Sequence, residues 1–263
     1  MIDDAELVAF LQWALPQRGF RWRGFRRVRS TVRKQLGVRL AQLGLQSLAE
    51  YRQRLERDPT EWDAFEPMCR IPISRFHRDR AVFEFLRGEI LPERAREALR
   101  ASRPVRVWSA GCASGEEPYT VAILWDLEVP HDTGIEILAT DAAEHMLERA
   151  RHGCYRQGSL RELAEPLRAA AFRREGDLYC LRDRHRAAVT FRCEDLRRTM
   201  PAGPFDVILC RYLAFNYFDE PTQRTMAERF AERLYPGGVL VIGAHDTLPE
   251  GVGLTERGPS VFG

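Results

Sequence analysis

The stretch from Val105 to Thr120 constrains the fold of this chain more than any other. It opens with a β-branched run, passes through a turn of small residues that includes Ala110 and Gly111, and enters an apolar segment after Glu116 and Glu117. A strand, a glycine turn and a helix in this order bring a nucleotide-like ligand against bare backbone at a helix N-terminus. We therefore expect the turn to contact such a ligand.

The two carboxylates at the start of the expected helix indicate which ligand. A phosphate binds best at a helix N-terminus without acidic side chains, where the helix dipole is positive. Glu116 and Glu117 would therefore repel a pyrophosphate. Ribose hydroxyls, an amine or a sulfonium would be accepted there. S-adenosylmethionine has all three and no phosphate, so it is the predicted cofactor.

Composition excludes several classes of protein. The chain has 263 residues and a formal charge of +2, so the molecule as a whole is not a binder of polyanions such as nucleic acid. No apolar run approaches the roughly 20 residues that cross a bilayer, and the acidic N-terminus does not resemble a secretory signal. We expect a cytoplasmic protein without membrane insertion.

The six cysteines are dispersed, without a Cys-x-x-Cys pair or another metal-ligand spacing. A chain of this length does not need disulfides to stabilise its core. We therefore expect reduced, mostly buried thiols and no metal site.

Residues 1 to about 60 are predicted to be helical. Leu7, Phe10, Leu11 and Ala14 recur at helical spacing, which is typical of a helix with one buried face. Between residues 18 and 39 there are nine basic residues and no acidic one. This basic segment is either a solvated face or a docking surface for an acidic protein partner; no nucleic-acid-binding motif accompanies it.

From residue 93 onward the pattern changes to strands that alternate with helices, and the strands are expected at 105–109, 135–139, 189–192, 205–210 and 239–243. This alternation predicts a parallel, doubly wound α/β sheet. We place the helical N-terminal domain at 1–92 and the α/β domain at 93–263.

Two acids follow expected strands in the α/β domain. Asp141 lies about 26 residues after the glycine turn, where an acid meets ribose hydroxyls in nucleotide-binding folds; as an alternative, it caps the next helix. Asp195 could accept a hydrogen bond from an adenine amino group. The polar segment 70–80 is a lid, a carboxylate clamp or a plain connection.

The segment Ser109-Ala-Gly-Cys-Ala-Ser-Gly-Glu-Glu-Pro-Tyr-Thr120 resembles the S-x-x-x-S/A-x-G-E-E-P-Y-S motif of CheR-type protein-glutamate methyltransferases. Segments 70–79, 139–141, 205–218 and 234–238 resemble further motifs of that family, in the same order along nearly the whole chain. The resemblance implies a Rossmann-like class I methyltransferase domain that binds S-adenosylmethionine and releases S-adenosylhomocysteine. It also implies a small helical N-terminal domain and a short inserted β-subdomain at about 172–191.

Eight site residues are assigned by their matching positions in the motifs of the family. In the family, one segment closes over the cofactor, acidic side chains contact it, and two residue pairs lie near the adenine and after a Cys-Arg pair. The matching residues here are Ser74, Arg78, Glu117 (or Glu116), Asp141, Asp195, Leu196, Tyr212 and Leu213. We expect Arg78 to fix the acceptor carboxylate next to the methyl group, with Tyr217 as a second catalytic candidate.

The chain departs from the family pattern at Pro72, His77, Tyr212 and the segment Gly243–Asp246. A glutamate carboxylate is already ionised near neutral pH, so its methylation needs no strong base. Glutamates of a chemoreceptor-like protein are the leading acceptor. The first alternative is a methyltransferase whose acceptor is a small molecule or another protein side chain. The second alternative is a non-catalytic module that binds S-adenosylmethionine.

Overall fold

The computed structural model describes residues 2–130 and 132–263 and divides into two compact units. A helical unit comprises the chain up to Ile71 together with Asn216–Gln223, and an α/β unit comprises Pro72–Phe215 and Arg224–Gly263. Segment 72–92, which the sequence analysis grouped with the helices, is therefore part of the α/β unit.

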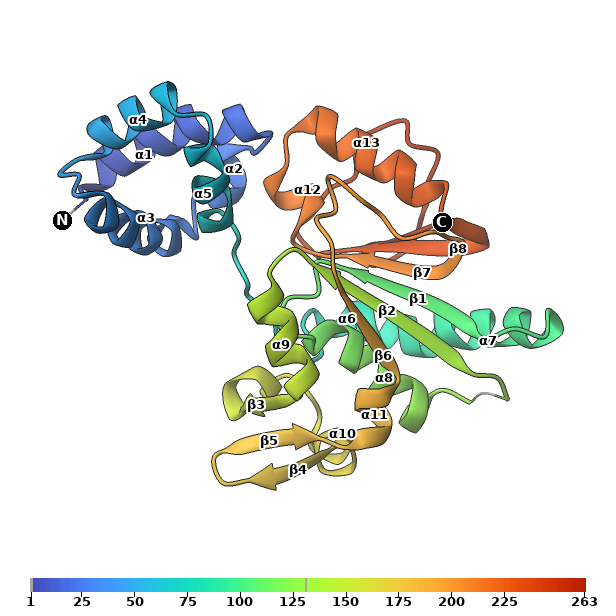
Figure 1. Ribbon diagram of the computed structural model, residues 1–263. Coiled ribbons are helices and arrows are strands. Elements are labelled where there is room, and N and C mark those ends of the chain that lie inside the picture. Colours follow the sequence, from blue (N-terminus) through green and yellow to red (C-terminus); the bar gives the residue numbers. More distant parts are fainter. Residues whose placement is uncertain (1, 131) are drawn as a thin grey trace. The chain divides into compact units, whose positions relative to one another are not determined.

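The helical unit contains short helices, and several begin or end where the sequence predicts. Ser47 accepts a hydrogen bond from the Glu50 N–H and caps α4, and Gly19 ends η1 in the left-handed conformation. The basic segment, expected as one helix, is broken at 26–28 into α2 and α3. The elements are α1 Asp4–Ala14, η1 Leu15–Arg18, α2 Trp22–Phe25, α3 Arg29–Leu43, α4 Leu48–Arg57 and α5 Glu61–Met68 (Figure 1).

The predicted apolar face of α1 is buried in the core of this unit. Leu7, Phe10, Leu11 and Ala14 are at most 5% exposed. The Phe10 ring lies 5.9 Å from the rings of Tyr51 and Phe65. Aromatic packing of this kind adds to the stabilisation from burial and joins α1 to α4 and α5.

The α/β unit is built on a seven-stranded sheet with the order β6-β2-β1-β7-β8-β10-β9. The first five strands are parallel, and β10 is antiparallel to both of its neighbours. The predicted doubly wound sheet is thus confirmed. The strands are β1 Val105–Ala110, β2 Ile135–Asp141, β6 Val189–Cys193, β7 Phe205–Cys210, β8 Leu234–Ile242, β9 Glu256–Gly258 and β10 Val261–Phe262.

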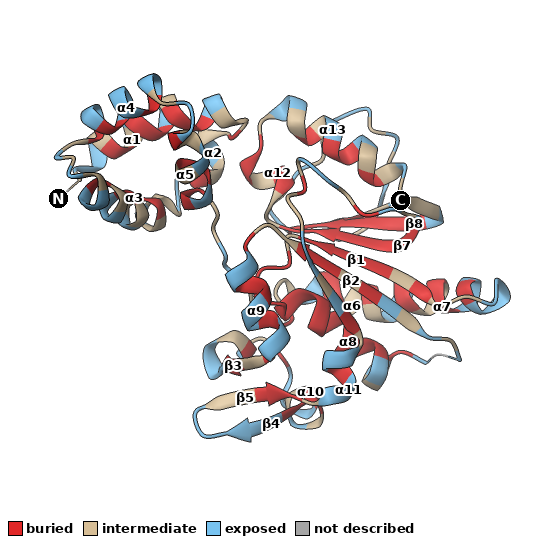
Figure 2. Cartoon of the chain, in the orientation of Figure 1, coloured by how far each residue is buried: buried red, intermediate tan, exposed pale blue. Residues whose placement is uncertain are grey.

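Both faces of this sheet are covered, because its central strands are apolar on both sides. Val105 and Val107 pack into the core that includes α8 Glu116–Glu128. Trp108 points the other way, and its ring lies 5.4 Å from that of Phe230 on α13 Glu220–Ala231. Figure 2 shows the central strands as buried. The remaining large helices of the unit are α6 Arg80–Phe85, η2 Leu86–Ile90, α7 Leu91–Arg100 and α9 Glu144–His152.

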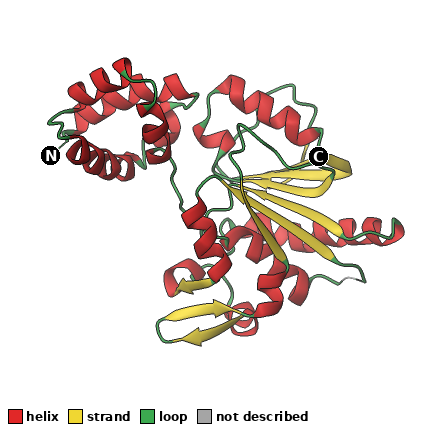
Figure 3. Cartoon of the chain, in the orientation of Figure 1, coloured by secondary structure: helices red, strands yellow, loops and turns green. Residues whose placement is uncertain are grey.

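A second, three-stranded antiparallel sheet with the order β3-β5-β4 lies in the chain between α9 and β6 (Figure 3). Two of its strands fall within the expected insertion at 172–191, whereas β3 comes earlier. The elements of this β-subdomain are β3 Cys154–Arg156, η3 Gln157–Leu160, α10 Glu165–Ala171, β4 Phe172–Glu175, β5 Leu178–Leu181 and α11 Asp183–Ala187.

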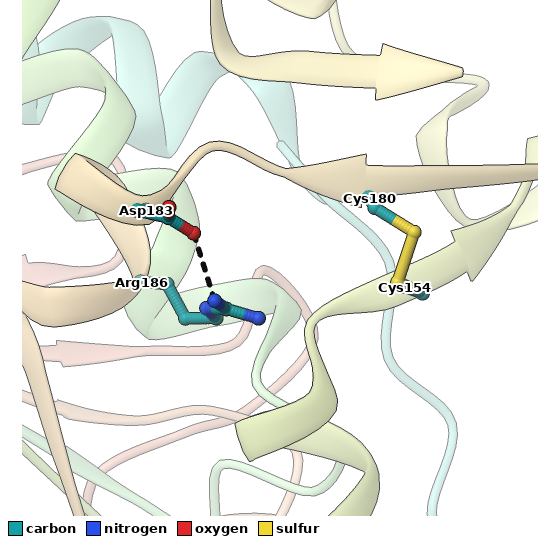
Figure 4. Close-up of a disulfide and its surroundings, with 4 residues drawn as sticks. All are labelled: Cys154, Cys180, Asp183 and Arg186. Carbon is teal, nitrogen blue, oxygen red and sulfur yellow. Dashed lines mark hydrogen bonds and ion pairs between the residues drawn. A yellow bond between two sulfur atoms is a disulfide. The ribbon is translucent and has the colours of Figure 1, made fainter. Parts of the chain in front are cut away.

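The expectation that all six cysteines are reduced thiols is wrong at two positions. Cys154 and Cys180 are partners across β3 and β5, with Cα atoms 4.0 Å apart, and form a disulfide (Figure 4). They are 26 residues apart in the sequence, and only the strand register brings them together. Of the free cysteines, Cys193 is exposed and the other three are buried.

Two smaller features complete the description. Thr60 precedes α5 with its backbone already in the helical region and makes no capping bond, and its hydroxyl donates to Asp58. Within the described residues, no helix has both the length and the apolar character required to cross a membrane.

Candidate functional site

Most of the predicted site residues follow the carboxyl ends of parallel strands. Ala110 ends β1, Asp141 ends β2, Asp195 follows β6, and Tyr212 follows β7. Since β1 lies between β2 and β7 and the strand order reverses there, these ends border the crevice where ligands bind in open α/β sheets. The structure thus brings the predicted residues to one edge of the sheet.

The glycine turn after β1 has a backbone that other residues would not adopt readily. Gly111 has a φ of +81°, and a Cβ added to it would lie 2.4 Å from Cδ2 of Leu213. Gly115 has a φ of +89° just before α8. The bare backbone at Gly111 therefore makes room for the Leu213 side chain, which any other residue at this position would displace.

The Asp141 carboxylate contacts both the glycine turn and the start of the next helix. One carboxylate oxygen accepts a hydrogen bond from the Ala113 N–H in the glycine turn, and the other accepts one from the Ala143 N–H before α9, each at 2.9 Å. The side chain thus braces the turn and the start of the next helix. Each oxygen of a carboxylate has a second lone pair, so ribose contact at this partly exposed residue stays a prediction.

Glu117 is part of a buried charged network. Its carboxylate accepts hydrogen bonds from the Ser109 hydroxyl at 2.7 Å and from the Arg211 guanidinium at 3.1 Å. Arg211 also donates to the Asp79 carboxylate at 2.8 Å and to the Arg78 carbonyl at 2.5 Å. This arginine therefore joins the end of β7 to α8 and to the segment that precedes α6. Arg211 belongs to the Cys-Arg pair of the motif at 205–218, but nothing else in the sequence singles it out as a site residue.

Glu116 points into a different environment. It is 2% exposed, and both of its carboxylate oxygens accept from the Ser114 hydroxyl, at 2.9 and 3.0 Å. Burial raises the pKa of Glu116, although hydrogen bonds that include those from Ser114 and Ser74 act in the opposite direction. The contact with Ser74 ties the segment before α6 to the first turn of α8.

The segment Ser74–Asp79 is packed onto the β-subdomain. The Phe76 ring meets those of Tyr155 and Phe172 edge-on, at 4.8 and 5.2 Å. The Tyr155 hydroxyl in turn donates to the Ser114 carbonyl in the glycine turn at 2.7 Å. The β-subdomain thus supports both the glycine turn and the segment that carries Arg78.

Arg78 and Asp79 both contact Tyr212. The Arg78 guanidinium lies 3.6 Å from the centre of the Tyr212 ring, and the Tyr212 hydroxyl donates to the Asp79 carboxylate at 2.6 Å. Burial alone would raise the pKa of Asp79, but hydrogen bonds from Tyr212 and Arg211 and the charge of Arg211 lower it. Burial, together with the Asp79 carboxylate, raises the pKa of Tyr212 to about 12.

Two predicted residues have other partners. The Asp195 carboxylate accepts hydrogen bonds from the Arg197 backbone N–H at 3.0 Å and from its guanidinium at 3.1 Å, while Leu196 is buried. Tyr217 belongs to the helical unit, where its ring lies 4.9 Å from that of Phe25. The contacts of Asp195 and Leu196 with adenine and the catalytic role of Tyr217 stay predictions.

The residues at this edge fit S-adenosylmethionine. The left-handed glycine turn lies at the end of β1, and Asp141 at the end of β2 offers carboxylate oxygens to hydroxyls. The two glutamates in the first turn of α8 disfavour a phosphate, and S-adenosylmethionine has none.

Comparisons with known proteins agree with this geometry. Residues 73–257 match the family model described as "CheR methyltransferase, SAM binding domain". The chain is 35% identical over 203 residues to the chemotaxis protein methyltransferase of Listeria monocytogenes, covering 77% of this chain and 75% of that protein.

Two further relatives are as similar. Chemotaxis protein methyltransferase 2 of Pseudomonas aeruginosa is 34% identical over 219 residues, which is 81% of this chain and 76% of that protein. The Escherichia coli chemotaxis protein methyltransferase is 34% identical over 226 residues, or 82% and 75%. The chain is therefore an S-adenosylmethionine-dependent methyltransferase, and it belongs to the CheR family.

Proposed function

We propose that this methyltransferase esterifies side-chain carboxylates, namely those of glutamates on a chemoreceptor-like protein. Bound S-adenosylmethionine supplies a methyl group on a sulfonium, and transfer to a carboxylate oxygen is a displacement at carbon. The chain must align the acceptor oxygen with the methyl carbon and exclude water. Orientation of this kind supplies several kcal/mol, with an upper range of about 7–11.

The protonation of the groups around Arg78 carries the proposal. The carboxyl of Asp79 has a lowered pKa, and the phenol of Tyr212 has a pKa raised to about 12. Neither group is suited to take a proton from an acceptor near neutral pH. An acceptor that is already ionised, such as a glutamate, does not require it.

For the same acceptor, Arg78 is the residue that we expect to hold the carboxylate. A guanidinium binds a carboxylate in a fixed, forked geometry. A grip that was too tight would stabilise the bound acceptor and slow the transfer. Among the described residues, the Arg78 guanidinium contacts a tyrosine ring and a backbone carbonyl but no carboxylate, so its charge is available to the acceptor.

The proposed partner is an acidic protein surface that docks on the basic helices. Arg29 and Arg33 both pair with Asp4, and Arg39 pairs with Glu61. Four other cations of this segment are exposed and have no carboxylate within 4.0 Å among the described residues; they are Arg23, Arg26, Arg27 and Lys34. Exposed cations of one sign attract an acidic partner. A cytoplasmic location belongs to the same proposal.

A hydroxyl or amine acceptor is the competing function. Such an acceptor would need a base, and His77 is the histidine next to Arg78 in the sequence. Its ring nitrogens are buried without a hydrogen-bond partner among the residues that the structure describes. This environment disfavours that role, because a base must reach the proton that it takes.

The test is transfer of a labelled methyl group from S-adenosylmethionine to the helical cytoplasmic fragment of a chemoreceptor. We expect label that is released as methanol in mild base, and no label on a fragment whose acceptor glutamates are replaced by alanine. Label that is stable to base, or equal labelling of both fragments, would refute the proposal.

A further inference from the structure

We propose that Tyr212 is a positioning residue for Arg78: its ring and its hydroxyl hold the Arg78–Asp79 corner in the geometry that methyl transfer requires. The inference rests on the proposed role of Arg78. It concerns a position at which this chain differs from the family motif, which has asparagine there.

The corner itself has an uncommon backbone. His77 and Asp79, on either side of Arg78, have φ values of 57° and 60°. Residues other than glycine are held in this left-handed region only when their surroundings determine it. Something outside the segment must therefore fix the direction in which the Arg78 side chain leaves the chain.

Tyr212 contacts both residues of the corner with different parts of one side chain. The ring face lies under the Arg78 guanidinium at 3.6 Å, and the hydroxyl donates to Asp79 at 2.6 Å. The Arg78 guanidinium also donates a hydrogen bond to the Ile73 carbonyl at 2.9 Å. A flat guanidinium between a ring and a carbonyl has little rotational freedom, whereas a free arginine side chain has much.

Tyr212 is in turn held in an unfavourable conformation. Its own φ is 56°, which for a bulky residue is an outlier that asparagine tolerates better. Its N–H donates to the Asp246 carboxylate at 2.8 Å, and the Gly243 N–H donates to the same oxygen at 2.9 Å. The carboxylate of Asp246 is therefore the partner that this conformation of Tyr212 uses.

Gly243 also makes room for the ring. A Cβ at this position would lie 3.0 Å from Cδ1 and Cε1 of Tyr212 and 2.8 Å from a carboxylate oxygen of Asp246. Gly243, Asp246 and Tyr212 thus form a set in which each residue depends on the others.

The experiment compares two substitutions of Tyr212, each alone and combined with Arg78→Ala. Tyr212→Phe keeps the ring under the guanidinium, and Tyr212→Asn removes the ring while suiting the left-handed backbone. We expect kcat to fall on the order of tenfold in Tyr212→Asn and by less in Tyr212→Phe, with the Kd for S-adenosylmethionine changed by less than kcat in both. In the Arg78→Ala background, Tyr212→Asn should have almost no further effect on kcat, because the side chain that it positions is gone.

Tyr235→Leu is the matched control. Tyr235 also lies under an arginine, with the Arg103 guanidinium 3.8 Å from its ring, but it lies near the start of β8, at the opposite edge of the sheet. This variant should retain the kcat of the parent enzyme. Should Tyr212→Asn fail to fold, as judged by its thermal unfolding, Tyr212→Gly takes its place, because glycine also lacks the ring and suits the left-handed backbone.

Equal losses in Tyr212→Phe and Tyr212→Asn, or the same loss with and without Arg78, would overturn the proposal. Failure of the proposed function is seen separately, because the parent enzyme would then not label the receptor fragment, or Arg78→Ala alone would keep the full rate.

Discussion

The Arg211 guanidinium lies 3.1 Å from the Glu117 carboxylate and closes a buried ion pair between the end of β7 and the first turn of α8. The pair fixes the two walls of the crevice relative to each other, since β1, which runs into the glycine turn, lies beside β7. The same arginine reaches Asp79, so one buried charge connects three segments of the site.

Removing the Glu117 carboxylate should therefore destabilise the α/β unit. Breaking a buried pair by deleting one partner costs up to about 3–5 kcal/mol. Since Asp79 and the Arg78 carbonyl still accept from Arg211, we expect about 1–3 kcal/mol for Glu117→Ala in urea unfolding. Glu136→Ala is the control, because Glu136 pairs with Arg106 at an exposed position and should change stability little. Equal effects of the two variants would contradict this account of the network.

Gly111→Ala should weaken cofactor binding. The added Cβ would lie 2.4 Å from Leu213, and the φ of +81° disfavours any side chain. We expect at least a tenfold higher Kd for S-adenosylmethionine by calorimetry, and a loss of about 1–3 kcal/mol in stability. Gly158→Ala should be neutral, because a Cβ there meets no atom within 4 Å and the backbone is not left-handed.

A second substitution separates the two causes at Gly111. Leu213→Ala removes the side-chain contact but leaves the backbone strain, so Gly111→Ala with Leu213→Ala should recover part of the lost stability. No recovery at all would show that the contact with Leu213 is not what excludes a side chain at this position.

The stability of the enzyme should fall as the pH decreases below neutrality, and His77 should account for part of the fall. Burial is the main cause that lowers the pKa of His77 below 6.5, and the positive charges of Arg80 and Arg87 act in the same direction, whereas Glu84 and Glu162 oppose it. The unfolded chain takes up this proton at about pH 6.5, and the folded chain only at lower pH. The unfolded state thus binds more protons in this window, so the free energy of unfolding decreases as pH falls.

His77→Phe should make that decrease shallower between about pH 7 and 5, measured by denaturant unfolding at each pH. Burial also lowers the pKa of His185, so a residual slope is expected. An unchanged slope would show that His77 is not titrated differently in the folded and unfolded chains.

The Cys154–Cys180 disulfide should stabilise the β-subdomain. It closes a loop between residues 26 apart, for which loss of chain entropy in the unfolded state predicts about 3–4 kcal/mol. The Cys154→Ser, Cys180→Ser variant should lose about this amount, while Cys193→Ser, at an exposed thiol, should lose little. Thiol titration of the unfolded, unreduced enzyme should give four thiols, and six would show that the bond is absent.

The main parallel strands and the edge of the sheet that carries the site follow from patterns that the sequence displays. The sequence predicts strand 205–210 to the residue, because all of its residues except Asp206 are apolar and it is bounded by Pro204 and the charged Arg211. The glycine turn and Asp141 were found because strand–turn–helix spacing determines where they lie.

What the sequence did not indicate depends on contacts between distant segments. In the sequence, Arg211 is one of many arginines. Only the folded structure, in which it is buried between Asp79 and Glu117, distinguishes it from the others. The disulfide depends on the register of β3 and β5, and the role of Tyr212 on a left-handed backbone. None of these has a periodic signature.

The most direct test of the account is the single-turnover rate of methyl transfer in Arg78→Ala, compared with the Kd for S-adenosylmethionine of the same variant. If Arg78 orients the acceptor carboxylate, the rate should fall by at least tenfold while the Kd changes by less. A rate equal to that of the parent enzyme, or a change confined to the Kd, would contradict the assignment.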